Sequence, residues 1–185
     1  MKNLNTYIQE NTCVNEKLTI VHKPSVYDYV YAPETKEELK EIIEKRLKQD
    51  PNADLNDIDV SNIKNMNKLF AGLDPYNIDI SRWDVSNVQD MSAMFKNCKN
   101  FNSDLSSWDT SNVENMIGMF YKCEEFNSDL SRWDVSNVKD MYCMFYNCMK
   151  FNSDLSRWDV SNVKYMNYMF DGCDNMKELP EWLKK

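Results

Sequence analysis

The sequence predicts an α/β solenoid: a stack of about five 25-residue strand-turn-helix units behind a helical N-terminal cap. When the chain is compared with itself at the shift that places Trp83 on Trp108, its other tryptophans align too, together with the apolar residues that follow them. A fixed period in this range is typical of stacked repeat units. Within each unit the spacing of apolar residues changes from two to about 3.6, as when a strand is followed by a helix. The aligned tryptophans are Trp83, Trp108, Trp133 and Trp158.

Residues 1–54 precede the repeats and contain the expected capping helix. Thr35 and Glu38 have the spacing of a capping box at its start. Such a helix can cover the apolar end of a stack, although it could instead dock onto a partner. Before it, Leu18 and Ile20 suggest a short strand. The apolar face of the helix consists of Leu39, Ile42, Ile43 and Leu47.

Residues 55–176 form the repeat region, and each unit is expected to hold one strand and one helix. In the third complete copy Leu130, Trp133 and Val135 mark the strand, and Ser136 can cap the helix that follows. An earlier, degenerate copy carries Ile58 at the tryptophan position, and residues 177–185 read as a C-terminal half-turn cap. The apolar face of the third helix would be Val138, Met141, Met144, Phe145 and Cys148.

The different spacings of strands and helices predict a curved stack. Neighbouring strands lie about 4.8 Å apart, whereas packed helices require about 8 to 10 Å. The strands would therefore line a concave face and the helices a convex face, in a leucine-rich-repeat-like geometry. If the V-x-x-M-x-x-M-F segment is not helical, the alternative is a right-handed parallel β-helix.

Composition limits the classes of partner and location. The 185-residue chain has 22 Lys and Arg against 30 Asp and Glu, a net charge of −8, which disfavours nucleic-acid binding through phosphates. The chain has no run of about 18 apolar residues, so membrane insertion is not expected. The first residues, MKNLNTYIQENTCVNEK, lack the apolar stretch of a secretory signal, so the sequence by itself predicts a cytoplasmic location. The six cysteines are expected to be reduced, and no cofactor is implied.

The repeated block F-N-x-D-L-S-x-W-D-V-S-N-V-x-x-M-x-x-M-F-x-x-C resembles the repeat of the BspA-like bacterial surface-protein family, a branch of the leucine-rich-repeat group. The match covers about residues 55–176. The resemblance implies a role in interaction or adhesion, often at a microbial cell surface, and it supplies no catalytic residues.

The first candidate site is a charged grid on the expected concave sheet. Arginines precede three of its aspartates by two residues, whereas Ser107 replaces arginine in the second complete copy. We expect either an acidic binding pocket around Asp84, Asp109 and Asp134 or a solvated lattice of salt bridges. The remaining members of the grid are Arg82, Arg132, Arg157 and Asp159.

The second candidate site is a group of tyrosines in the last three repeats. They occupy variable positions of the expected helices, where they could form a convex interaction surface or simply pack between helices. Its members are Tyr121, Tyr142, Tyr146, Tyr165 and Tyr168.

These features favour a non-enzymatic scaffold that binds a protein partner of unknown identity, through the concave sheet or the tyrosine side. The alternative is a calcium-dependent adhesive or structural element that uses the repeated aspartates of the charged grid (the aspartate ladder), because Ca²⁺ prefers oxygen ligands. No set of nucleophile, base and orienting group can be assembled from the repeated residues, so we do not expect an enzyme.

Overall fold

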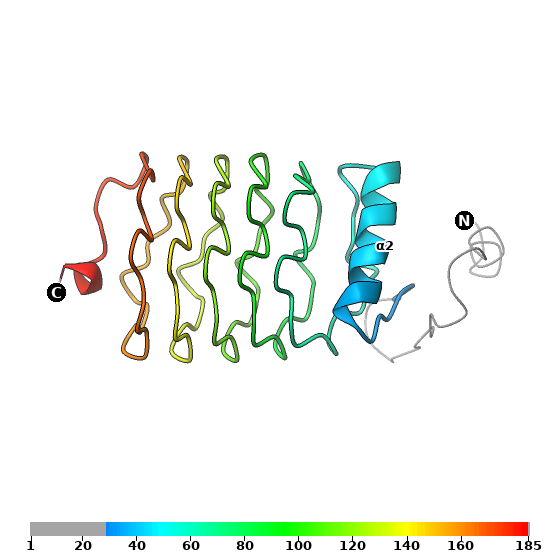
Figure 1. The fold of residues 1–185 in the computed structure, drawn as a ribbon, viewed down its shortest axis with the longest axis horizontal. Coiled ribbons are helices and arrows are strands. Elements are labelled where there is room, and N and C mark those ends of the chain that lie inside the picture. Colours follow the sequence, from blue (N-terminus) through cyan, green and yellow to red (C-terminus); the bar gives the residue numbers. More distant parts are fainter. Residues whose placement is uncertain (1–28, 185) are drawn as a thin grey trace.

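The computed structural model describes residues 29–184, which form an elongated stack of coils closed at one end by a helix. Helix α2 (Lys36–Gln49) lies at that end, and the short 3-10 helix η1 (Glu181–Leu183) lies at the other (Figure 1). The 25-residue period divides the chain between them into coils 1 to 5, at residues 55–79, 80–104, 105–129, 130–154 and 155–179. The strand expected at Leu18 and Ile20 falls outside the described residues.

Helix α2 is present where the sequence predicted a helix. The Thr35 hydroxyl accepts the Glu38 N–H at 3.2 Å, as in a capping box, but the Glu38 carboxylate accepts the N–H of Glu34 instead of that of Thr35. The helix buries Leu39, Ile42 and Ile43 in the same apolar core as coil 1, with Leu47 packed at its edge.

The predicted α/β solenoid is wrong, because the repeats of residues 55–179 contain no α-helix. In coil 4, both Cys143 and Asn147 have positive φ angles. These angles lie in the left-handed region, which interrupts an α-helix. Successive β-turns bury every third residue, so the V-x-x-M-x-x-M-F spacing fits them as well as it fits a helix. The same two positions are left-handed in every coil: Lys68, Ala93, Gly118, Cys143 and Tyr168, and Gly72, Asn97, Lys122, Asn147 and Gly172.

The right-handed parallel β-helix is also wrong, because residues 29–184 contain six isolated parallel bridges and no sheet. In coil 4 the N–H groups of Met141, Cys143, Phe145 and Asn147 donate to carbonyls of coil 5 at 2.7 to 3.0 Å. The intervening N–H groups donate within the coil: those of Met144 and Tyr146 to the carbonyl three residues earlier, and that of Tyr142 to the Asp140 carboxylate. Only every second peptide joins neighbouring coils, so continuous strands do not form.

The segment around each tryptophan, which we predicted to be a strand, consists of turns. The Trp133 N–H donates to the Leu130 carbonyl at 3.1 Å. Side chains join the coils here: Trp133 Nε1 donates to the Leu105 carbonyl at 3.0 Å, and Asn137 Nδ2 donates to the Ser111 carbonyl at 2.7 Å. With neither a sheet nor outer helices in the repeats, the predicted concave and convex faces do not exist.

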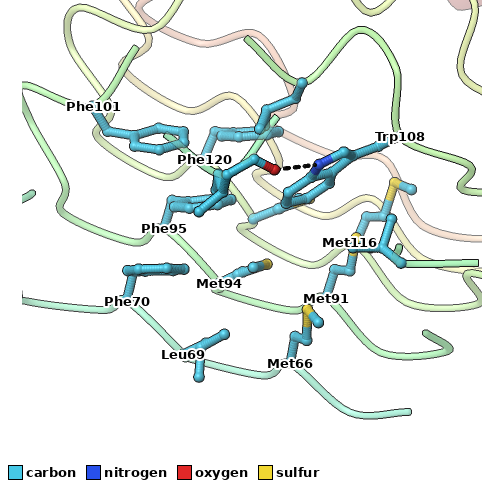
Figure 2. Close-up of a cluster of buried hydrophobic side chains, with 14 of the residues drawn as sticks. Met66, Leu69, Phe70, Met91, Met94, Phe95, Phe101, Trp108, Met116 and Phe120 are labelled. Atoms are coloured by element: carbon cyan, nitrogen blue, oxygen red, sulfur yellow. Dashed lines mark hydrogen bonds between the residues drawn. The ribbon is translucent and has the colours of Figure 1, made fainter. Parts of the chain in front are cut away.

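The core consists of identical side chains stacked in files along the molecule. Phe95 and Phe145 each lie 5.6 Å from the ring of Phe120, and the Trp108 and Trp133 rings are 6.4 Å apart. Figure 2 shows part of the phenylalanine file, with the rings of Phe70, Phe95 and Phe120. Trp83 lies 6.5 Å from Trp108, so Trp83, Trp108 and Trp133 form one file, as expected if aligned residues of consecutive repeats stack on one another. Cysteines 25 residues apart form a buried file in which each thiol donates to a phenylalanine carbonyl of the preceding coil, and burial raises the pKa of Cys98 to about 12. The file consists of Cys98, Cys123, Cys148 and Cys173.

Candidate interaction surface

The aspartates of the predicted grid each hold a local turn. The Asp109 carboxylate accepts the N–H of Ser111 at 3.0 Å, which is the geometry of an Asx turn. Hydrogen bonds from the Ser111 hydroxyl and N–H hold the pKa of Asp109 below its ordinary value. The same contact, from the N–H two residues later, is made by Asp84, Asp134 and Asp159.

The arginines of the grid lie beside a different file of aspartates. Arg82 Nη2 lies 3.9 Å from Asp54 Oδ2. Ser131 is the main cause of the lowered pKa of Asp129, and Arg132 adds a smaller electrostatic contribution. Arg157 acts in the same way on Asp154, where Ser156 is again the main cause of the lowered pKa. A polar hollow of about 600 Å³ is lined by Asn127, Ser128, Asp129, Ser131, Arg132, Asn152, Ser153, Asp154 and Arg157.

The second complete copy, whose departures from the repeat suggested a binding pocket, uses those residues to bond to neighbouring coils. The Ser107 hydroxyl donates to the Ser81 carbonyl at 2.7 Å. Thr110, which replaces the valine of the other complete copies, donates its hydroxyl to the Asp134 carbonyl at 2.8 Å. Both replacements therefore bond to neighbouring coils. In residues 29–184 no three His, Cys, Asp or Glu side chains gather where they could hold a metal ion.

Four of the tyrosines, in contrast, meet in two ring pairs on coils 3 to 5. The rings of Tyr121 and Tyr146 stack with centroids 5.0 Å apart, and those of Tyr142 and Tyr168 meet edge to face at 5.9 Å. Each pair includes a residue of coil 4, Tyr146 in the first and Tyr142 in the second. The exposed fractions of Tyr142, Tyr165 and Tyr168 are 43%, 58% and 56%. We call these four paired residues, together with the exposed Tyr165 of coil 5, the tyrosine surface.

Sequence reasoning missed the groups that border the tyrosine surface. Lys96 Nζ lies 4.9 Å from the Tyr121 ring centroid, and Lys122 Nζ lies 5.5 Å from it. Lys96 occupies the position of Tyr121 in the preceding repeat, so the repeat period could have placed them together. A hydrogen bond with the thiol of Cys143 raises the pKa of Tyr142.

A family model described as "Mycoplasma protein of unknown function, DUF285" matches residues 37–142 and 73–183. The chain belongs to this family. Membership in DUF285 is compatible with the resemblance to BspA-like proteins. Searches of curated proteins and of solved structures found no significant match to this DUF285 chain. No helix among residues 29–184 has the length and apolar character needed to cross a membrane.

Proposed function

We propose that this DUF285 protein is a non-enzymatic scaffold that binds a protein partner through its tyrosine surface. The observation that carries the proposal is the meeting of four tyrosine rings on adjoining coils. Two of these four, Tyr142 and Tyr168, are widely exposed, as is Tyr165. Tyrosine offers a large, rigid contact area with a polar tip, and it is enriched at protein interfaces. Coil 1 carries smaller or charged residues at the corresponding positions, such as Lys68 and Ala71, so stacking of the coils does not require tyrosine there.

The backbone at Tyr168 supports the proposal. Its φ is positive, in the left-handed region. This conformation costs a bulky L-residue about 1 to 2 kcal/mol relative to the right-handed one. Its side chain is 56% exposed, so little burial offsets that strain. A residue kept in this position against its conformational preference is more readily explained by a role in binding.

The charged grid supports binding less well than the tyrosine surface does. Its aspartates already accept hydrogen bonds from the turns that they close, and a Ca²⁺ ion needs six to eight oxygens that converge on one point. The calcium-dependent alternative therefore draws no support from the described residues. The resemblance to BspA-like surface proteins supports a finer proposal, that the bound partner serves adhesion at a cell surface.

The proposal can be tested by site-specific photo-crosslinking in the native cells. A photoreactive phenylalanine analogue at Tyr165 should give a discrete adduct with one protein. The matched control is Tyr76 in coil 1, which is 55% exposed but lies outside the tyrosine surface. With the purified partner, Tyr165→Ala should weaken binding at least about tenfold, the effect of losing one interface anchor. Equal adducts at both positions, or equal affinity of Tyr165→Ala and Tyr76→Ala, would contradict the proposal.

A further inference from the structure

In each V-x-x-M-x-x-M-F segment four backbone hydrogen bonds between coils run in the same direction, whereas other backbone bonds, such as that from the Lys139 N–H to the Glu114 carbonyl, run the opposite way. The peptide that joins Asp140 to Met141 accepts from the Met116 N–H with its carbonyl and donates to the Tyr165 carbonyl with its own N–H. Three further peptides of each interior coil relay bonds in the same way, at N···O distances of 2.7 to 3.2 Å. Four parallel chains of hydrogen bonds therefore run from coil 1 to coil 5, with every N–H directed toward the C-terminal end.

The four chains end in unpaired donors at coil 5. Among the described residues no group accepts a hydrogen bond from the backbone N–H groups of Met166, Tyr168, Phe170 and Gly172. We call these four residues the open edge. Its apolar side chains are also incompletely covered: Met166 and Phe170 are partly exposed, whereas their counterparts in coil 4, Met141 and Phe145, are fully buried.

The C-terminal tail covers a different part of this end. Trp182 Nε1 donates to the Leu155 carbonyl at 2.8 Å, and its ring lies 6.3 Å from that of Phe170. The tail therefore replaces the missing tryptophan of a further coil, but it supplies no carbonyls to the open edge.

The direction of the bonds determines what can bind at the open edge. Aligned peptide dipoles leave partial positive charge at an end that presents N–H groups, so the complement must present a row of carbonyls. Within the stack that complement is the V-x-x-M-x-x-M-F segment of the next coil, for example the carbonyls of Tyr165, Asn167, Met169 and Asp171 facing coil 4.

A second copy of this chain does not fit the open edge. Two open edges brought face to face would oppose N–H groups to N–H groups. The other end of the stack is closed, because α2 lies over coil 1 and leaves Met66 and Phe70 fully buried (Figure 1).

We propose that the open edge binds an extended segment of the V-x-x-M-x-x-M-F type presented by another polypeptide. The carbonyls of the segment accept the four N–H groups, and its apolar side chains cover Met166 and Phe170. This is strand addition restricted to one polarity. The inference does not depend on a partner for the tyrosine surface, because it uses backbone groups and the apolar end of the stack.

Amide hydrogen exchange, measured residue by residue, tests the proposal. The probe is a synthetic peptide with the sequence of residues 137–151, whose carbonyls at Asp140, Tyr142, Met144 and Tyr146 accept from coil 3 in the intact protein. Without the peptide, the four open-edge amides should exchange at least about a hundredfold faster than those of Met141, Cys143, Phe145 and Asn147. Millimolar peptide should slow the open-edge amides by about tenfold or more.

The matched control is the same peptide with Met144→Asp, which places a charge where the segment would contact the apolar end and should not slow exchange. Sedimentation at the same protein concentration should show a monomer. Lack of slowing by the unmodified peptide, or equal slowing by the control peptide, would overturn the proposal. Protection of the open edge in a self-associated protein would assign a second copy to it and would overturn it as well. The Tyr165→Ala variant should still bind the peptide, which separates this result from the crosslinking test.

Discussion

The left-handed residues determine the backbone of each coil, and their effect can be isolated at one position. Ala93 and Gly118 occupy the same position in coils 2 and 3, and both have positive φ. A Cβ at Gly118 would make only ordinary contact, 3.6 Å from the Cβ of Tyr121. A substitution between alanine and glycine here therefore changes backbone strain with little change in packing.

We expect opposite effects of the two reciprocal substitutions on stability. Gly118→Ala should lower the free energy of unfolding by about 1 kcal/mol, because alanine is strained at positive φ. Ala93→Gly should raise it by about 0.5 kcal/mol, since relief of strain exceeds the added flexibility of the unfolded chain. Urea unfolding followed by tryptophan fluorescence measures both, and a shift of the two midpoints in the same direction would contradict this account.

The positions of the glycines in the sequence indicate these turns. All three glycines of the chain, Gly72, Gly118 and Gly172, occupy the two left-handed positions of the repeat. Other residue types occupy those positions in the remaining coils, so glycine does not recur with the repeat period and its pattern does not stand out. The repeat period did place the tyrosines in the last three coils, but only the structure shows which rings meet.

At the scale of elements, α2 was predictable and the repeats were not. A helix that contains a capping box, an apolar face and a following Asp-Pro pair combines independent signals. The V-x-x-M-x-x-M-F segment offered only its spacing, which helices and successive turns share. Alternation around Trp133 likewise indicated a strand, although its indole and Asn137 form the bonds that strand peptides would otherwise form.

The Trp133 side chain joins two coils where the backbone does not, so loss of its indole N–H should lower the free energy of unfolding. Trp133→Phe keeps an aromatic ring but leaves the buried Leu105 carbonyl without its indole donor. We expect this variant to lose about 2 kcal/mol in the free energy of unfolding. Trp182→Phe in the tail, where the indole is only partly buried, should cost less than half as much. Thermal and urea unfolding of both variants would test this order, and equal losses would argue against it.

At the scale of the whole molecule, the Asx turns make stability depend on pH. The pKa values of five turn aspartates lie below their ordinary value, chiefly because the serine two residues later donates hydrogen bonds to each: Asp104, Asp109, Asp129, Asp154 and Asp159. A carboxyl group whose pKa is lower in the folded state stabilises the fold above its unfolded pKa of about 3.9. That stabilisation disappears as the pH falls through the folded pKa.

The free energy of unfolding should therefore be nearly constant from about pH 7 to 5 and should fall steadily below about pH 4. Asp109→Asn should make the fall less steep, because asparagine can close the same turn without titrating. Asn115 already does so, accepting the Ile117 N–H at 3.0 Å. Urea unfolding at a series of pH values measures the slope, and an unchanged slope in Asp109→Asn would remove this aspartate from the explanation.

The uniform direction of the four hydrogen-bond chains also separates the length of the molecule from the character of its two ends. Gain or loss of one whole coil in the interior would change the length by about 4.8 Å and leave both termini as they are. Duplication or deletion of whole repeats in the gene would thus change the length of the stack in equal steps without altering the surface at either end.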